Sequence, residues 1–190
     1  ASVDKYKKYG FEPADLIPTS KLNVKELWSQ LQREIKTISK PHFKRLVTQI
    51  LLDHKQKFQI YPASISFHYN YQHGLLEQTV SLIKIAKLLA RNYAVNSDLL
   101  LTGACLHQIG KLYSINVGFS DKKNDSKQLV GNAILSRDIV NKYINQIKKF
   151  PEDDKVQLEH LILSYQGRRE WQSPIEPQTI EAILLHTKCL

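Results

Sequence analysis

The stretch GLLEQTVSLIKIAKLLARNY, residues 74–93, decides the fold class. Its apolar residues recur every three to four positions, which is the spacing of one face of an α-helix. Further leucines and isoleucines fall outside that face, so this helix is too apolar to lie free on a surface. We therefore predict a long helix here, central to the fold and covered by other helices.

The flanking sequence repeats the helical pattern in both directions. Asn23 precedes an apolar repeat and is followed by Glu26, which is the arrangement of a capping box. Pro41, Pro151 and Pro177 stand where three further helices start, a place that tolerates proline. Besides 74–93, two predicted helices follow Asn23 and Pro41. Another is capped by Asn96 and runs from Asp98 to a glycine stop at Gly110. The rest cover about 128–149, 152–165 and 177–189. No segment alternates like a strand, so the predicted fold is all-α, with about seven helices.

Length and composition favour one domain behind a short N-terminal arm. The chain has 190 residues, of which 42% are hydrophobic, and this is enough for one core. Residues 1–22 show little periodicity, so we predict an arm or linker there and a helical domain over residues 23–190. No apolar run is long enough to span a membrane. The two cysteines, Cys105 and Cys189, do not indicate a disulfide framework, which favours a cytoplasmic setting.

The charge is basic and unevenly distributed. The net charge is +9, and residues 1–60 hold 12 Lys/Arg against 6 Asp/Glu. A basic region suits an anionic partner such as RNA or single-stranded DNA. The same excess would also be found on a solvated face that only keeps a protein soluble. Charge alone leaves both interpretations open.

Three short stretches carry a resemblance to a known family. They are HYNYQHGLLEQT (68–79), LLTGACLHQIGK (100–111) and EHLILSYQGRREWQSPIEPQTIEAILLHTKCL (159–190). Together they resemble the HD-domain phosphohydrolase superfamily, and most of all its branch of YhaM-type 3′-5′ exoribonucleases. DLIPTS (15–20) resembles the linker that leads into the HD domain there. The resemblance covers about residues 15–190 and implies an HD-domain-like helical bundle.

The resemblance also implies a divalent-metal site, and this sequence departs from its ligand pattern. Of the positions where ligands are expected, only His107 carries one. The others carry Gln78, Gln108, Asn132, Tyr165, Gln166 and Cys189. A catalytic metal needs several imidazoles and carboxylates, whereas amides and a phenol are weak ligands. We therefore expect a degenerate metal site, no cofactor and no catalytic residue.

A second set of residues forms candidates for binding without catalysis. Lys111, Arg168 and Arg169 are candidate phosphate-binding cations, with His68 and Trp171 as further candidate contacts to nucleic acid. A polar pocket that still binds a phosphate, sugar or base is one interpretation. The other, which we favour, is a cavity whose polar side chains satisfy one another.

Three functions follow from these observations. The leading one is a catalytically inactive HD-fold domain that binds nucleic acid, or acts as a scaffold, within a nucleic-acid-processing protein. An alternative is an active metal-dependent 3′-5′ exonuclease or nucleotide phosphohydrolase with a rearranged Mn²⁺ or Mg²⁺ site. That site needs three of His68, His73, His107 and His186 to converge. The third is a protein–protein module that forms homo-oligomers, as the resembled family does.

The resemblance carries one further expectation about the ends of the chain. It implies a small β-barrel domain ahead of the HD domain, and only 14 residues precede DLIPTS. We therefore expect either a piece of a longer protein or a protein without that barrel.

Overall fold

A computed structural model describes residues 18–64, 68–114 and 129–189. Within these ranges the chain is helical, apart from one isolated β-bridge between Thr19 and Gln72. The helices are α2 (Val24–Lys36), α3 (Pro41–Asp53), α4 (Lys55–Ile60), α5 (Gly74–Asn92), α6 (Ser97–Leu106), α7 (Lys111–Ser114), α9 (Asn132–Ile144), α10 (Glu152–Ser164) and α11 (Ile180–Cys189), with a 3₁₀ helix η2 (Arg169–Trp171). The predicted all-α fold is confirmed.

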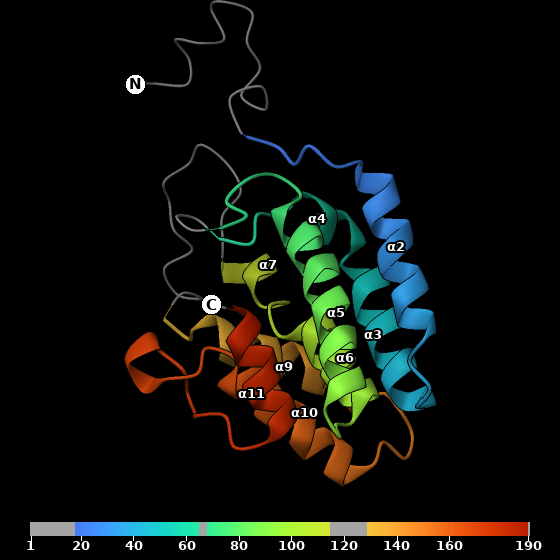
Figure 1. Cartoon of the computed structure of the whole chain (residues 1–190), viewed down its shortest axis with the longest axis vertical. Coiled ribbons are helices and arrows are strands. Elements are labelled where there is room, and N and C mark those ends of the chain that lie inside the picture. The colour runs from blue at the N-terminus through green and yellow to red at the C-terminus, as the bar shows by residue number, and fades with distance from the viewer. Residues whose placement is uncertain (1–17, 65–67, 115–128, 190) are drawn as a thin grey trace, which may run out of the picture.

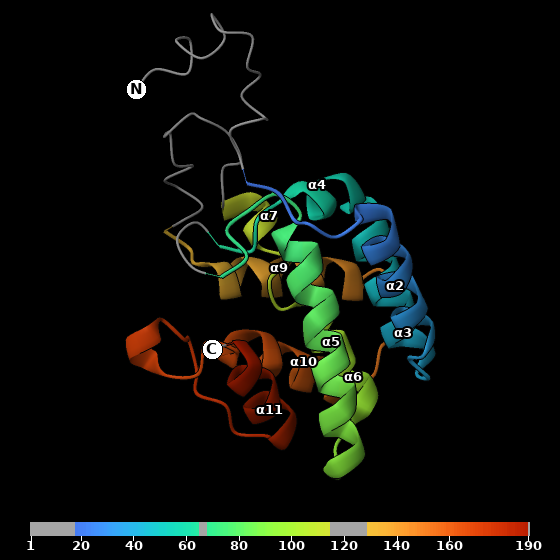
Figure 2. The ribbon, with the colours of Figure 1, turned by 45° about the horizontal axis from the view of Figure 1, so that its top comes forward.

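The buried centre of the bundle is α6. All residues from Leu99 to Leu106 are buried, and α6 packs against α3, α5, α10 and α11. Helix α5, which the sequence predicts to be central, runs through the middle of the view in Figures 1 and 2, with α2 and α3 on one side. It packs against α2, α4, α6 and α11. One side of α5 nevertheless faces solvent, as the 58% exposure of Leu88 shows.

Three helices begin where the sequence predicts, two of them at a cap and one at a proline. The Asn23 side chain accepts hydrogen bonds from the backbone N–H groups of Lys25 and Glu26, at 2.9 and 3.3 Å. The Asn96 side chain accepts from the N–H of Leu99 at 3.1 Å. Pro41 lies in the first turn of α3. These bonds satisfy N–H groups that have no partner inside the helix.

Gly110 has a different role from the glycine stop that the sequence predicts. Helix α6 already ends at Leu106, with His107 as its C-cap. A Cβ atom on Gly110 would lie 2.6 Å from the backbone oxygen of Asn132 and 2.7 Å from the backbone nitrogen of Ser136. The Gly110 N–H donates to Ser136 Oγ at 2.9 Å. Gly110 therefore lets the start of α9 pack directly against the connection between α6 and α7.

The sequence predicts an N-terminal arm over residues 1–22 and no membrane-spanning segment. Residues 1–17 of the predicted arm lie outside the described residues. The part of the arm that is described pairs with residue Gln72, since the Ser20 N–H donates to the Gln72 oxygen at 3.0 Å. Within the described ranges, no helix is both long and apolar enough to cross a membrane.

Candidate functional site

His107 lies at the C-terminal end of α6, and the fold holds its ring in one orientation. The ring is buried, with 1% of the residue exposed. Its Nδ1 lies 3.1 Å from the carbonyl oxygen of Gly103 and 3.2 Å from that of Ala104. Carbonyl oxygens only accept hydrogen bonds, so Nδ1 carries the proton and Nε2 carries the lone pair of the neutral ring.

The surroundings of His107 keep its ring neutral. Burial, and after it the positive charge of Lys111, lower the pKa of His107 to about 3. The hydrogen bonds to the two carbonyl groups act in the opposite direction but are outweighed. His107 is therefore a neutral imidazole at physiological pH, which is the form that binds metals.

Two of the positions predicted to be former ligand positions lie beside this ring. The Tyr165 ring meets the His107 ring edge to face, with centroids 4.9 Å apart. The Tyr165 hydroxyl accepts a hydrogen bond from Asn132 Nδ2 at 2.8 Å. Asn132 Oδ1 is buried without a hydrogen-bond partner in the described part of the chain. The structure thus brings His107, Tyr165 and Asn132 together from α6, α10 and α9.

The remaining former ligand positions are not joined to this group. Gln108 is buried, whereas Gln78 and Gln166 are half-buried. Among the described residues, none of the three glutamines is hydrogen-bonded to His107, Tyr165 or Asn132, and Gln78 Oε1 is buried without a partner. Cys189 is the last residue of α11, and its side chain lies outside what the structure describes.

The candidate cation Lys111 and the candidate His68 differ in their surroundings. The Lys111 ammonium donates to the backbone carbonyl of Ala63, so it holds the end of the α4–α5 connection. Lys111 is half-buried, whereas His68 lies on an exposed turn. The role of either residue in binding remains a prediction.

A second cluster forms around the segment after α10. The guanidinium of Arg168 lies over the Trp171 ring, 5.2 Å from its centroid, and the Trp171 and His186 rings are 5.8 Å apart. Trp171 is 43% exposed, and the neighbouring Arg169 is exposed too. An exposed aromatic ring with a guanidinium over it, and a second arginine next in sequence, has the composition of a nucleic-acid contact.

Gly167 leaves room for the His186 ring beside this cluster. The sequence does not predict this contact. Gly167 has a φ of +85°, and a Cβ atom there would lie 2.0 Å from the His186 ring. His186 Nδ1 donates to the carbonyl of Tyr165 at 3.1 Å, which holds the ring over the glycine. The glycine itself could have indicated a close approach at this position, but no residue near it in the sequence identifies His186 as the neighbour.

The four histidines of the rearranged site do not converge. His186 is bonded to the carbonyl of Tyr165, and His73 Nδ1 is bonded to the carbonyl of Gln59. Within the described residues, no group of three or more His, Cys, Asp or Glu side chains is placed to hold a metal ion.

Comparisons with known proteins match this chain to a family. A family model described as HD domain matches residues 75–187. A curated relative named 3′-5′ exoribonuclease YhaM, from Listeria welshimeri, is 28% identical over 178 residues, which cover 93% of this chain and 56% of the relative. Proteins of the same name from a Geobacillus species and from Bacillus subtilis are 29% and 28% identical, over 91% and 90% of this chain and 53% and 55% of their own lengths. This chain thus spans a little over half the length of these relatives. No solved structure matches it.

These matches correct the expectation that no cofactor is involved. They point to a metal-dependent enzyme family, in which a metal ion is the expected cofactor. The sequence prediction counted ligand types and overlooked orientation. His107 keeps the geometry of a metal-ligating histidine, with Nδ1–H bonded to backbone carbonyls and Nε2 as the remaining donor atom. The described residues around it, Asn132 and Tyr165, do not fit the rest of a catalytic ligand set.

Proposed function

The chain belongs to the HD-domain family, and from this premise we propose that it is part of a nucleic-acid-processing protein in which it binds single-stranded RNA without cleaving it. The observation that carries the proposal is the contact between His107, Tyr165 and Asn132. Hydrolysis of a phosphodiester needs an activated water and positive charge at the phosphate oxygens. A neutral imidazole, a phenol and an amide supply neither.

RNA as the partner is supported by the relatives and by charge. The curated relatives are named exoribonucleases. The chain carries a net charge of +9, which favours a polyanion. We place one contact at Arg168, Arg169 and Trp171, where the indole can stack on a base and the guanidinium groups can bind phosphates.

An active metal-dependent exonuclease is the second candidate, favoured by the orientation of His107. Its Nε2 is the atom with which a histidine held in this way would bind a metal ion. A third candidate, the protein–protein module, would bind no RNA. The predicted cytoplasmic location and self-association do not separate the three candidates.

Salt-dependent RNA binding tests the proposal. We expect a fluorescently labelled single-stranded RNA to bind the chain, with an affinity that falls steeply as salt rises, because phosphate contacts release counterions. Arg168→Ala should weaken binding by about tenfold and make the salt dependence shallower by roughly one counterion.

Lys25→Ala is the matched control for this experiment. Lys25 is an exposed cation on α2, which lies on the other side of the molecule from α11 in Figure 1. Lys25→Ala should change the affinity for RNA less than twofold, because the proposal assigns Lys25 no contact to a phosphate. Equal effects of the two substitutions would place the RNA elsewhere on the surface. No RNA binding at low salt would contradict the proposal and favour the protein–protein module.

A further inference from the structure

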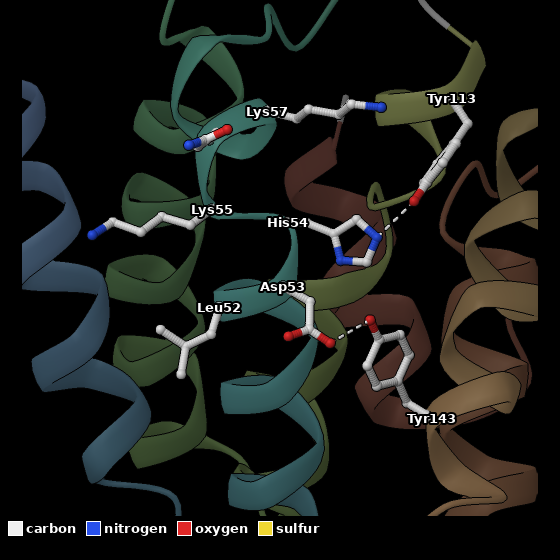
Figure 3. Close-up of a pocket in the computed structure, with 8 residues that line it drawn as sticks. Leu52, Asp53, His54, Lys55, Lys57, Tyr113 and Tyr143 are labelled. Atoms are coloured by element: carbon white, nitrogen blue, oxygen red, sulfur yellow. Dashed lines mark hydrogen bonds between the residues drawn. The ribbon is translucent and has the colours of Figure 1, made fainter.

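A cavity of about 600 Å³ is lined by none of the predicted former metal-site positions. It lies where α3 passes into α4, opposite α7 and α9 (Figure 3). Its wall includes Asp53, His54, Lys57, Tyr113 and Tyr143. Binding sites for small molecules have volumes of roughly 300–1,000 Å³ and combine apolar surface with a few oriented polar groups.

Two hydrogen-bonded pairs orient the polar groups of the cavity. The Tyr143 hydroxyl donates to Asp53 Oδ2 at 2.7 Å. His54 Nδ1 donates to the carbonyl of Ile50 at 2.8 Å, so its Nε2 accepts from the Tyr113 hydroxyl, also at 2.8 Å. Each pair joins the α3–α4 junction to a helix on the other side of the cavity, as Figure 3 shows. The groups are thus held in place before any ligand arrives.

Tyr143 stays neutral, and a cation lies beside the Tyr113 ring. Burial, followed by the hydrogen bond to Asp53, raises the pKa of Tyr143 to about 12. The Lys57 ammonium lies 5.0 Å from the centroid of the Tyr113 ring. Lys55, two residues earlier, points the other way and lies over the Trp28 ring at 5.4 Å (Figure 3). Only Lys57 of these two lysines is turned toward the tyrosines.

The cavity is separate from the group around His107. Asn132 and Tyr143 both belong to α9 and are 11 positions apart in the sequence. At 1.5 Å per residue they are about 16 Å apart along the helix axis. A ligand of this cavity would therefore not occupy the position of the family's metal ions.

We propose that this cavity binds one nucleotide, with its base against the tyrosine rings and its phosphate at Lys57. Asp53 would accept a hydrogen bond from an N–H group of the base or a hydroxyl of the sugar, because its Oδ1 atom is not the one bonded to Tyr143. Aromatic stacking and a lysine–phosphate contact are the two interactions that recognise nucleotides of any sequence. The inference rests on the proposed function, since the nucleotide can be free or part of the bound RNA.

Calorimetric titration of the whole chain with each of the four ribonucleoside monophosphates tests the inference. We expect binding that Lys57→Ala weakens at least about fivefold, the effect of losing one charge-assisted contact. Lys55→Ala is the matched control and should change it less than twofold. Tyr143→Phe should also weaken binding, because Asp53 loses the hydroxyl that orients it. Circular dichroism of each variant checks that the helices are intact.

Titration with single-stranded RNA separates the two sources of the nucleotide. If Lys57→Ala weakens only RNA binding, the cavity takes a nucleotide of the strand. If it weakens monophosphate binding as well, a free nucleotide is sufficient. The inference fails if Lys57→Ala changes the affinity for monophosphates and for RNA no more than Lys55→Ala does. If RNA still binds in that case, the cavity proposal is wrong and the proposed function stands. If monophosphates bind but RNA does not, the proposed function is wrong and the cavity proposal stands.

Discussion

At the scale of single residues, Tyr165 stands at a predicted former ligand position and makes contacts between helices. Its ring packs on His107 and its hydroxyl accepts from Asn132. Both partners come from other helices. The sequence identified all three positions through their resemblance to a family pattern. It could not place them in contact with one another, because a hydrogen bond between distant helices leaves no local pattern in either.

Tyr165→Phe tests that contact. The change removes the hydroxyl and leaves the Asn132 amide buried without its acceptor, so we expect the free energy of unfolding to fall by about 1–2 kcal/mol. Urea denaturation measures it. In a double-mutant cycle with Asn132→Ala the two losses should not add, with a coupling of roughly 1 kcal/mol. Additive losses would mean that the two side chains do not interact.

At the scale of elements, long helices and their caps could be predicted, whereas short helices and close approaches could not. The capped starts at Asn23 and Asn96 were predicted because capping depends on neighbouring residues. Helices α4 and α7 have only six and four residues, too few to show a period. The role of Gly110 depends on α9, which is distant in the sequence.

Gly167→Ala tests the close approach of α10 and α11. The substituted Cβ would meet the His186 ring and the residue would keep a positive φ, so we expect a loss of about 3 kcal/mol in unfolding free energy. Gly131→Ala is the control, because Gly131 has a φ of +81° with nothing within 4 Å of the added atom. That variant should lose only about 1 kcal/mol. Equal losses would show that positive φ alone accounts for the cost.

Asp154 links the starts of α3 and α10 and makes stability depend on pH. Its carboxylate accepts from Lys40 Nζ at 2.8 Å and from His42 Nε2 at 2.7 Å. Burial alone would raise the pKa of Asp154, but these hydrogen bonds outweigh it and hold the pKa below the ordinary value of 3.8. The unfolded chain therefore takes up a proton first, so this stabilisation is present above about pH 4 and is lost as the pH falls further.

Asp154→Asn should remove that pH dependence. We expect a loss of about 2 kcal/mol at pH 7 and a smaller further loss than in the wild type between pH 5 and pH 3. Thermal unfolding across that range measures both. Asp153→Asn, an exposed neighbour in the same turn, should leave the pH profile unchanged. A wild-type profile in the Asp154 variant would show that the linkage contributes nothing.

At the scale of the whole molecule, the chain is an all-helical member of the HD-domain family and holds the His107 ring in one orientation. The fold was predictable because helical periodicity and family motifs extend over most of the chain. The cofactor could not be predicted, because the family implies a metal ion whereas the residue types at the predicted ligand positions argue against one. The cavity between α3–α4 and α7–α9 was also missed. Its residues come from three separate segments of the chain, residues 52–57, Tyr113 and Tyr143, and none stands in a motif.

The most direct test of the account is the fate of a bound RNA. A single-stranded RNA labelled at its 5′ end is incubated with the purified chain and Mn²⁺, at a protein concentration that binds all of the RNA, and its length is read on a denaturing gel. The account predicts that the RNA stays at full length. Progressive shortening from the 3′ end, abolished by His107→Ala, would contradict it and would make this chain an active metal-dependent exonuclease.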